Sequence, residues 1–111
     1  RALAVTSDVR TSALPDVPTL AEAGVRDFEA TAWFGVQAPA RVPRPVIERL
    51  GAEIDAIVRE PSYLARIAEL GGSPPGLTPQ GGSTPAAFEA YIRGEITKWA
   101  EVVRVSGATV D

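Results

Sequence analysis

Two long stretches of the chain carry apolar residues at the three- and four-residue spacing of an amphipathic helix. The first runs over residues 43–59, and the second begins at Pro85 and ends near Gly107. In each stretch the apolar side chains fall on one continuous stripe. These side chains are Val46, Ile47, Leu50, Ile54, Ile57 and Val58 in the first stretch and Phe88, Tyr91, Ile92, Ile96, Trp99, Val102 and Val103 in the second. The pattern predicts a helix in each.

A shorter helix is predicted over 62–70, where the same spacing recurs between Pro61 and the pair Gly71-Gly72. The residues that follow, 71–84, are mostly Gly, Pro and Ser. Such a segment has little to bury, so we expect a mobile surface loop.

Two stretches favour strands. Residues 2–7 form a short apolar run before a polar segment, and residues 28–38 alternate between an apolar set and a mixed set. In the second stretch Trp33 and Phe34 point to opposite faces, and Gly35 leaves room beside them. The second face therefore suits either a packed layer of helices or an approaching ligand.

A helix start is predicted between the two strands. Thr19 and Glu22 have the spacing of a capping box, in which each side chain binds the other residue's backbone amide. Pro15 and Pro18 before it forbid a regular helix, and Gly24 after it suits a left-handed stop. We therefore expect one or two turns of helix over 19–23.

Together these elements predict an α/β fold in which helices cover a small parallel or mixed sheet as αβα layers. Two or three strands make a thin sheet for three helices. The chain also has no Met and opens at Arg1 directly before a strand-like run. We therefore expect that it is a piece of a longer protein, with any targeting signal upstream.

Composition then excludes several classes of function. The 111 residues include no Cys and no His, which removes thiol nucleophiles, imidazole bases and the commonest metal ligands. The net charge of −3 does not indicate a basic surface of the kind that binds nucleic acid. No apolar run is long enough to span a membrane. We predict no catalytic residue, no metal and no cofactor.

The remaining polar residues have ordinary interpretations. The carboxylates fall on helix faces and loop caps, where Asp and Glu are usually exposed, and no spacing pairs two of them in a cleft. Lys98, the only lysine, sits at the border of an apolar stripe, and we interpret it as a surface residue. The glycine pairs at 71–72 and 81–82 lack the Lys-Ser/Thr ending of a phosphate loop.

Four blocks of the sequence carry a resemblance to a known family. They are residues 1–7 (RALAVTS), 14–24 (LPDVPTLAEAG), 33–40 (WFGVQAPA) and 88–99 (FEAYIRGEITKW), with Ser106-Gly107-Ala108 near the end. In order and spacing they resemble the C-terminal third of the Bug-type extracytoplasmic solute receptors of tripartite tricarboxylate transporters. The second and fourth blocks together are fairly specific, and the resemblance covers nearly the whole chain.

The resemblance implies one part of a periplasmic, two-lobed receptor with the type II periplasmic-binding-protein fold. Such receptors hold a small organic acid or amino acid between the lobes and deliver it to membrane permease subunits without chemical change. In the family, backbone amides and bridging waters hold much of the ligand carboxylate, and amides bind anions without a charged side chain. Residues 1–38 would then supply strands and an inter-lobe hinge, with 1–8 and 28–38 as the hinge segments, and residues 39–111 the helical part of one lobe.

The residues expected to border the ligand are Ser7, Asp16, Trp33, Phe34 and Gly35. Two features depart from the family pattern. Val42 stands where a polar cap is expected before the helix over 43–59, so this start should fray. The 71–84 loop is several residues longer than usual, and we assign it no function.

Two alternatives remain open. The chain could be a small α/β interaction or dimerisation module. Under the receptor interpretation, the apolar stripes of the three helices exceed what a thin sheet covers, so we expect the piece alone to associate, for example as a homodimer. An enzyme fragment would need carboxylates as Mg²⁺ ligands, with Asp8 or Asp16 essential. A signal peptide and about two hundred residues upstream would support the receptor instead.

Overall fold

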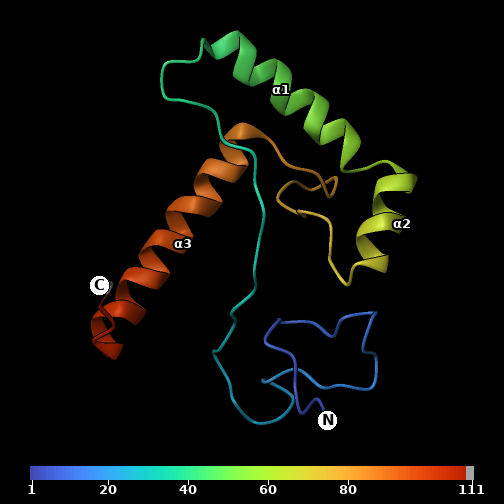
Figure 1. Ribbon diagram of the computed structural model, residues 1–111, viewed down its shortest axis with the longest axis vertical. Coiled ribbons are helices and arrows are strands. Elements are labelled where there is room, and N and C mark those ends of the chain that lie inside the picture. The colour runs from blue at the N-terminus through green and yellow to red at the C-terminus, as the bar shows by residue number, and fades with distance from the viewer. Residues whose placement is uncertain (110–111) are drawn as a thin grey trace. The chain divides into compact units, whose positions relative to one another are not determined.

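The structure is a computed structural model and describes residues 1–109. Three helices appear in the described residues: α1 (Arg44–Ile57), α2 (Pro61–Glu69) and α3 (Pro85–Ser106), labelled in Figure 1. The chain divides into two compact units, one made of residues 1–40 and 61–73 and the other of 41–60 and 74–111. The three helices lie where the apolar periodicity predicts them, within two residues at each end.

Helix α1 begins without a side-chain cap, as Val42 led us to expect. Pro43 occupies the N-cap position and offers no hydrogen-bonding side chain, while Pro45 lies in the first turn, where its missing N–H is no loss. The helix ends at Ile57, and its C-cap residue Val58 is the buried apolar side chain of the described residues, with an exposed fraction of 7%.

Helix α3 has a defined cap at each end. The hydroxyl of Thr84 accepts a hydrogen bond from the Ala87 amide, and Pro85 opens the first turn. At the other end Gly107 adopts the left-handed conformation with φ 67°, and its amide donates to the Val103 carbonyl. Both predicted boundaries of this helix are confirmed.

Helices α1 and α3 meet at a glycine. A Cβ placed on Gly51 of α1 would lie 2.5 Å from Cγ of Pro85 at the start of α3, so the two helices approach more closely than any larger residue permits. The last turn of α1 adds a polar contact, in which the Asp55 carboxylate accepts a hydrogen bond from the Ser83 amide at 2.9 Å. These contacts hold the start of α3 against α1.

The Gly/Pro-rich loop is more ordered than the sequence indicates. Residues 76–82 fold back on themselves, because the Leu77 amide donates to the Gly82 carbonyl and the Gly82 amide donates to the Thr78 hydroxyl. Gly82 is buried against Asp55, with no space for a Cβ. The expected surface loop is thus tied to α1 by the hydrogen bond from the Ser83 amide to the Asp55 carboxylate, which does not depend on apolar side chains.

The predicted sheet is not shown by the residues that the structure describes. Residues 2–7 form one parallel bridge, between Val5 and Thr19, and no strand is present over 28–38. The Ala30 amide donates to the Thr6 carbonyl, but beyond Ala30 the chain runs extended without backbone pairing (Figure 1). A strand needs a hydrogen-bonded neighbour over several residues, and this chain supplies too few. The αβα layers are therefore not formed here.

The expected helix over 19–23 is reduced to a single turn. The Ala23 amide donates to the Thr19 carbonyl, and the chain then leaves the turn at Gly24, whose φ is 98°. A second departure from right-handed backbone follows at Asp27, with φ 58°, a conformation that Asp tolerates better than most residues. This turn lies beside the Val5–Thr19 bridge and leads into the extended segment.

Candidate functional site

The five candidate ligand residues all belong to the unit that contains residues 1–40. Ser7 follows the bridged residue Val5, and its hydroxyl donates to the Val9 carbonyl at 2.8 Å. Asp16 lies in the turn before Thr19 and is exposed. Trp33, Phe34 and Gly35 lie on the extended segment, where the exposed fraction of Phe34 reaches 97%.

Hydrogen bonds tie the segments of Ser7 and Asp16 to each other. The Val5 amide donates to the Pro18 carbonyl at 2.9 Å, and the Leu20 amide donates to the Val5 carbonyl at 3.0 Å. Thr19 lies between Pro18 and Leu20, and its exposed fraction is 3%. The structure therefore brings Ser7 and Asp16 onto one framework.

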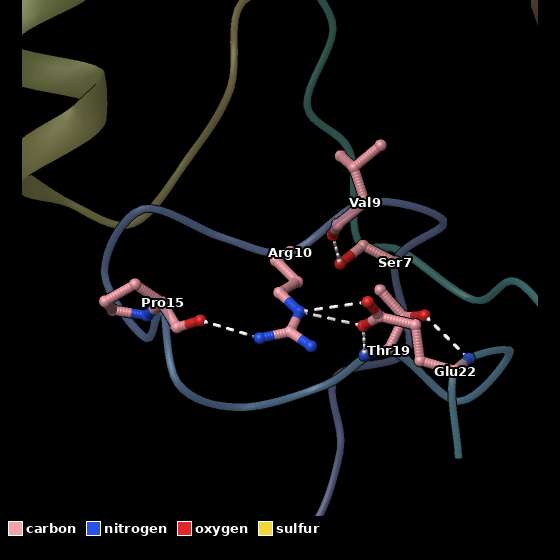
Figure 2. Close-up of polar contacts among 6 residues, drawn as sticks. All are labelled: Ser7, Val9, Arg10, Pro15, Thr19 and Glu22. Atoms are coloured by element: carbon pink, nitrogen blue, oxygen red, sulfur yellow. Dashed lines mark hydrogen bonds and ion pairs between the residues drawn. The ribbon is translucent and has the colours of Figure 1, made fainter.

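The capping box predicted from the sequence is confirmed and forms part of a larger network. The Thr19 amide donates to Glu22 Oε2 at 2.8 Å, and the Glu22 amide donates to the Thr19 hydroxyl at 3.2 Å. Arg10 joins this pair through its guanidinium, with Nε 2.8 Å from Glu22 Oε2 and Nη1 3.1 Å from the Pro15 carbonyl (Figure 2). One arginine thus touches both the capping carboxylate and the residue before Asp16.

The charges of this network stabilise one another. The hydrogen bond from Arg10 lowers the pKa of the Glu22 carboxyl, and the bond from the Thr19 amide lowers it further. The same hydrogen bond raises the pKa of Arg10, and the charge of Asp16 adds a smaller effect in the same direction. The guanidinium therefore lies within the electrostatic reach of both carboxylates.

Arg10 is the residue that sequence reasoning missed. It stands in a polar run whose residues follow no period, and its partner Glu22 lies twelve positions away. Local spacing identifies the Thr19–Glu22 pair, but a contact between two loop segments leaves no periodic signal. The one sequence signal for this contact is that a nearby arginine could pair with the capping carboxylate of Glu22.

Two of the features considered in the sequence, a carboxylate cluster and Lys98, can be compared with the described residues. Across residues 1–109 no group of three or more acidic, His or Cys side chains is arranged to hold a metal ion. Lys98 forms an ion pair with Glu95 at 2.9 Å and lies over the Trp99 ring, 5.4 Å from its centroid. Its interpretation as a residue on the helix surface agrees with these contacts.

The other unit has an open hollow between the first turns of α1 and α3. Two ion pairs hold its polar side chains, Arg44 with Glu48 at 2.7 Å and Arg93 with Glu89 at 2.6 Å. The hollow is lined by Arg44, Ile47, Glu48, Thr84, Pro85, Ala86 and Glu89. None of the predicted ligand residues lies there. Among the helices described, none has the length and apolar character needed to cross a membrane.

Comparison with known proteins matches almost the whole chain. Residues 1–106 match the sequence profile described as "Tripartite tricarboxylate transporter family receptor". A curated relative from Agrobacterium vitis, the "UPF0065 protein in the TAR-I ttuE-ttuC' intergenic region", is 37% identical over 106 residues. The match covers 96% of this chain and 30% of that protein.

Two solved structures are also similar to the chain. The structure of "R. palustris Rpa4515 with adipate" gives a TM-score of 0.80 at 32% identity and covers 95% of this chain and 33% of that one. The "Structure of periplasmic binding protein BugD" gives 0.77 at 33% identity and covers 94% of this chain and 33% of that one. The chain thus spans about a third of the length of the proteins it matches.

Proposed function

Because the chain belongs to the tripartite tricarboxylate transporter receptor family, we propose that it forms one part of a periplasmic solute receptor. The receptor captures a small carboxylate or amino acid and passes it to the membrane subunits of the transporter. It binds and releases this ligand without changing it chemically.

The observation that carries this proposal is the family match over residues 1–106, together with the likeness to a binding protein solved with adipate. The composition supports it, since the sequence contains neither Cys nor His. Backbone amides suffice to hold a carboxylate, so a receptor needs none of the side chains that are missing.

In this proposal Ser7 and Asp16 border the ligand on one framework, and residues 33–35 approach it from the extended segment. The anion stabilises a closed state through contacts that exist only there. Residues 1–8 and 28–38 act as hinges by small changes in backbone dihedral angles. Residues 28–38 are described as neither helix nor strand, which supports this role for the second segment.

The test uses the full-length product of the gene that encodes this chain. Its thermal unfolding is measured with adipate, succinate, L-aspartate, L-glutamate and benzoate, each at millimolar concentration. A ligand at 100 times its Kd stabilises the native state by about 2.7 kcal/mol, which gives a clear rise in Tm for the cognate class. Absence of a shift with every acid, or conversion of any of them to a product, would contradict the proposal.

A further inference from the structure

We propose that Arg10 is a positioning residue that, with Glu22, holds both ends of the Pro15–Thr19 turn against the bridged segment that carries Ser7. The inference rests on the proposed function, which places Asp16 and Ser7 at the border of the ligand. Arg10 itself contacts no ligand in this account. It sets where the turn lies.

The geometry of the turn shows how the two residues act together. At the first end, Arg10 Nη1 donates to the Pro15 carbonyl at 3.1 Å. At the second end, the Thr19 amide donates to Glu22 Oε2 at 2.8 Å. Arg10 Nε links the two ends by donating to both carboxylate oxygens of Glu22, at 3.1 and 2.8 Å (Figure 2). The turn that contains Asp16 is therefore fastened at both ends to one ion pair.

The fastened turn is also joined to the segment of Ser7. Val5 binds the backbone on both sides of Thr19, through the Pro18 carbonyl and the Leu20 amide. Ser7 lies two residues after Val5, and its hydroxyl is held by the Val9 carbonyl at 2.8 Å. A shift of the turn at Pro15 therefore changes the distance between Asp16 and Ser7. Binding sites lose affinity when their groups move by a fraction of an ångström.

The contacts call for an arginine and not merely for a positive charge. A guanidinium donates from Nε and Nη1 in one plane at fixed angles, so it reaches a carboxylate and a carbonyl together. The ammonium of a lysine is a single point on a flexible chain and cannot reproduce both bonds at once. Replacing Arg10 by Lys retains the charge and removes the geometry.

The ion pair is too exposed to serve mainly the stability of the fold. The side chains of Arg10 and Glu22 are 46% and 47% exposed, and such pairs contribute little to the free energy of unfolding. Loss of the pair should therefore affect the local turn and ligand binding more than the Tm. A change in ligand binding without a comparable change in Tm distinguishes a positioning role from a purely structural one.

The experiment compares Arg10→Lys and Glu22→Gln with wild type in the full-length gene product. The matched control is Glu89→Gln, which removes another exposed ion pair, with Arg93, in the other unit. For each protein we measure the Kd for the acid, among adipate, succinate, L-aspartate, L-glutamate and benzoate, that wild type binds most tightly. Tm and the amide hydrogen exchange of residues 14–20 are measured alongside.

We expect Arg10→Lys and Glu22→Gln to raise Kd about tenfold, because displacement of Asp16 relative to Ser7 weakens the contacts with the ligand by about 1.4 kcal/mol. They should accelerate exchange at residues 14–20 and leave Tm within about 2 °C of wild type. Glu89→Gln should change none of the three. A Kd in Arg10→Lys equal to that of wild type, or a Kd that rises only in proportion to a falling Tm, overturns the inference.

A failure of the proposed receptor function can be distinguished from a failure of the Arg10 inference. If wild type binds none of the five acids, the receptor proposal fails, and exchange at residues 14–20 alone then decides whether Arg10 holds the turn. Faster exchange in Arg10→Lys supports that role, and unchanged exchange overturns it.

Discussion

At the scale of single residues, Gly51 shows how closely α1 and α3 are packed. A Cβ there would lie 2.5 Å from Cγ and 2.6 Å from Cδ of Pro85, and a proline ring has little freedom to move away. Gly94, in α3, has no heavy atom within 4 Å of the corresponding point. The same substitution should therefore have opposite effects at the two glycines.

We predict that Gly51→Ala lowers the free energy of unfolding by about 1 kcal/mol. Alanine improves the helix propensity by about 1 kcal/mol, but the steric overpacking against Pro85 costs about 1–3 kcal/mol. Gly94→Ala, which gains the propensity without the clash, should raise it by about 0.5–1 kcal/mol. Urea denaturation measures both. A Gly51→Ala protein as stable as Gly94→Ala would contradict the described contact between α1 and α3.

The Arg10–Glu22 pair predicts a pH dependence. Glu22 has a pKa below its usual 4.5 in the folded protein, so its ion pair stabilises the fold above that pH. This contribution is lost as the pH falls through the lowered pKa of the folded state. Between pH 7 and about pH 3.5, wild type should therefore lose more stability than Glu22→Gln does.

The control for this prediction is Arg10→Gln. It removes the larger cause of the lowered pKa and keeps the hydrogen bond from the Thr19 amide, so its pH dependence should lie between those of wild type and Glu22→Gln. The measurement is denaturant unfolding at the two pH values. Equal losses of stability in wild type and Glu22→Gln would mean that the pair does not form.

At the scale of elements, the start of α3 depends on one hydroxyl. Thr84 caps the helix through the Ala87 amide at 3.2 Å, whereas Thr97, in the middle of the same helix, donates to the Arg93 carbonyl. We predict that Thr84→Ala costs about 1 kcal/mol of stability. Thr97→Ala should be neutral or slightly stabilising, since alanine is the better helix former.

Circular dichroism during urea denaturation checks this pair of variants. The two substitutions remove the same atoms, one at the N-cap and one inside the helix, so a loss of stability confined to Thr84→Ala reports the cap. Equal effects would show that Thr84 does not cap α3 in solution.

Helices were the part of the fold that the sequence made predictable. The stripe from Phe88 to Val103, the Thr84-Pro85 start and the Gly107 stop are all local signals, and they lie within one element. The strand prediction over 28–38 failed because a strand also requires a partner, and alternation along one segment says nothing about whether a partner is present.

The loop contact at Asp55 and the Arg10 contact beside the candidate site could not be predicted, for a related reason. Asp55 binds the Ser83 amide across 28 positions, and Arg10 reaches Glu22 across 12. Neither contact leaves a local pattern in the sequence. The Thr19–Glu22 box was predictable because its two residues are three apart and satisfy each other's amides.

At the scale of the whole chain, most large apolar side chains remain accessible. Leu3, Phe34, Val36 and Val105 are each at least 70% exposed. Exposed apolar surface of this kind favours association. We predict that the 111-residue chain, prepared alone, has a weight-average mass that rises with concentration in light scattering. A single monomeric mass at every concentration up to the millimolar range would contradict this.

The central claim is that this chain supplies only part of a ligand site, and calorimetry tests it most directly. Adipate, succinate and L-aspartate are titrated into the 111-residue chain and into the full-length gene product under the same conditions. The account predicts binding of at least one acid by the full-length product and no heat of binding from the chain alone. Sub-millimolar binding of any of these acids by the isolated chain would contradict it.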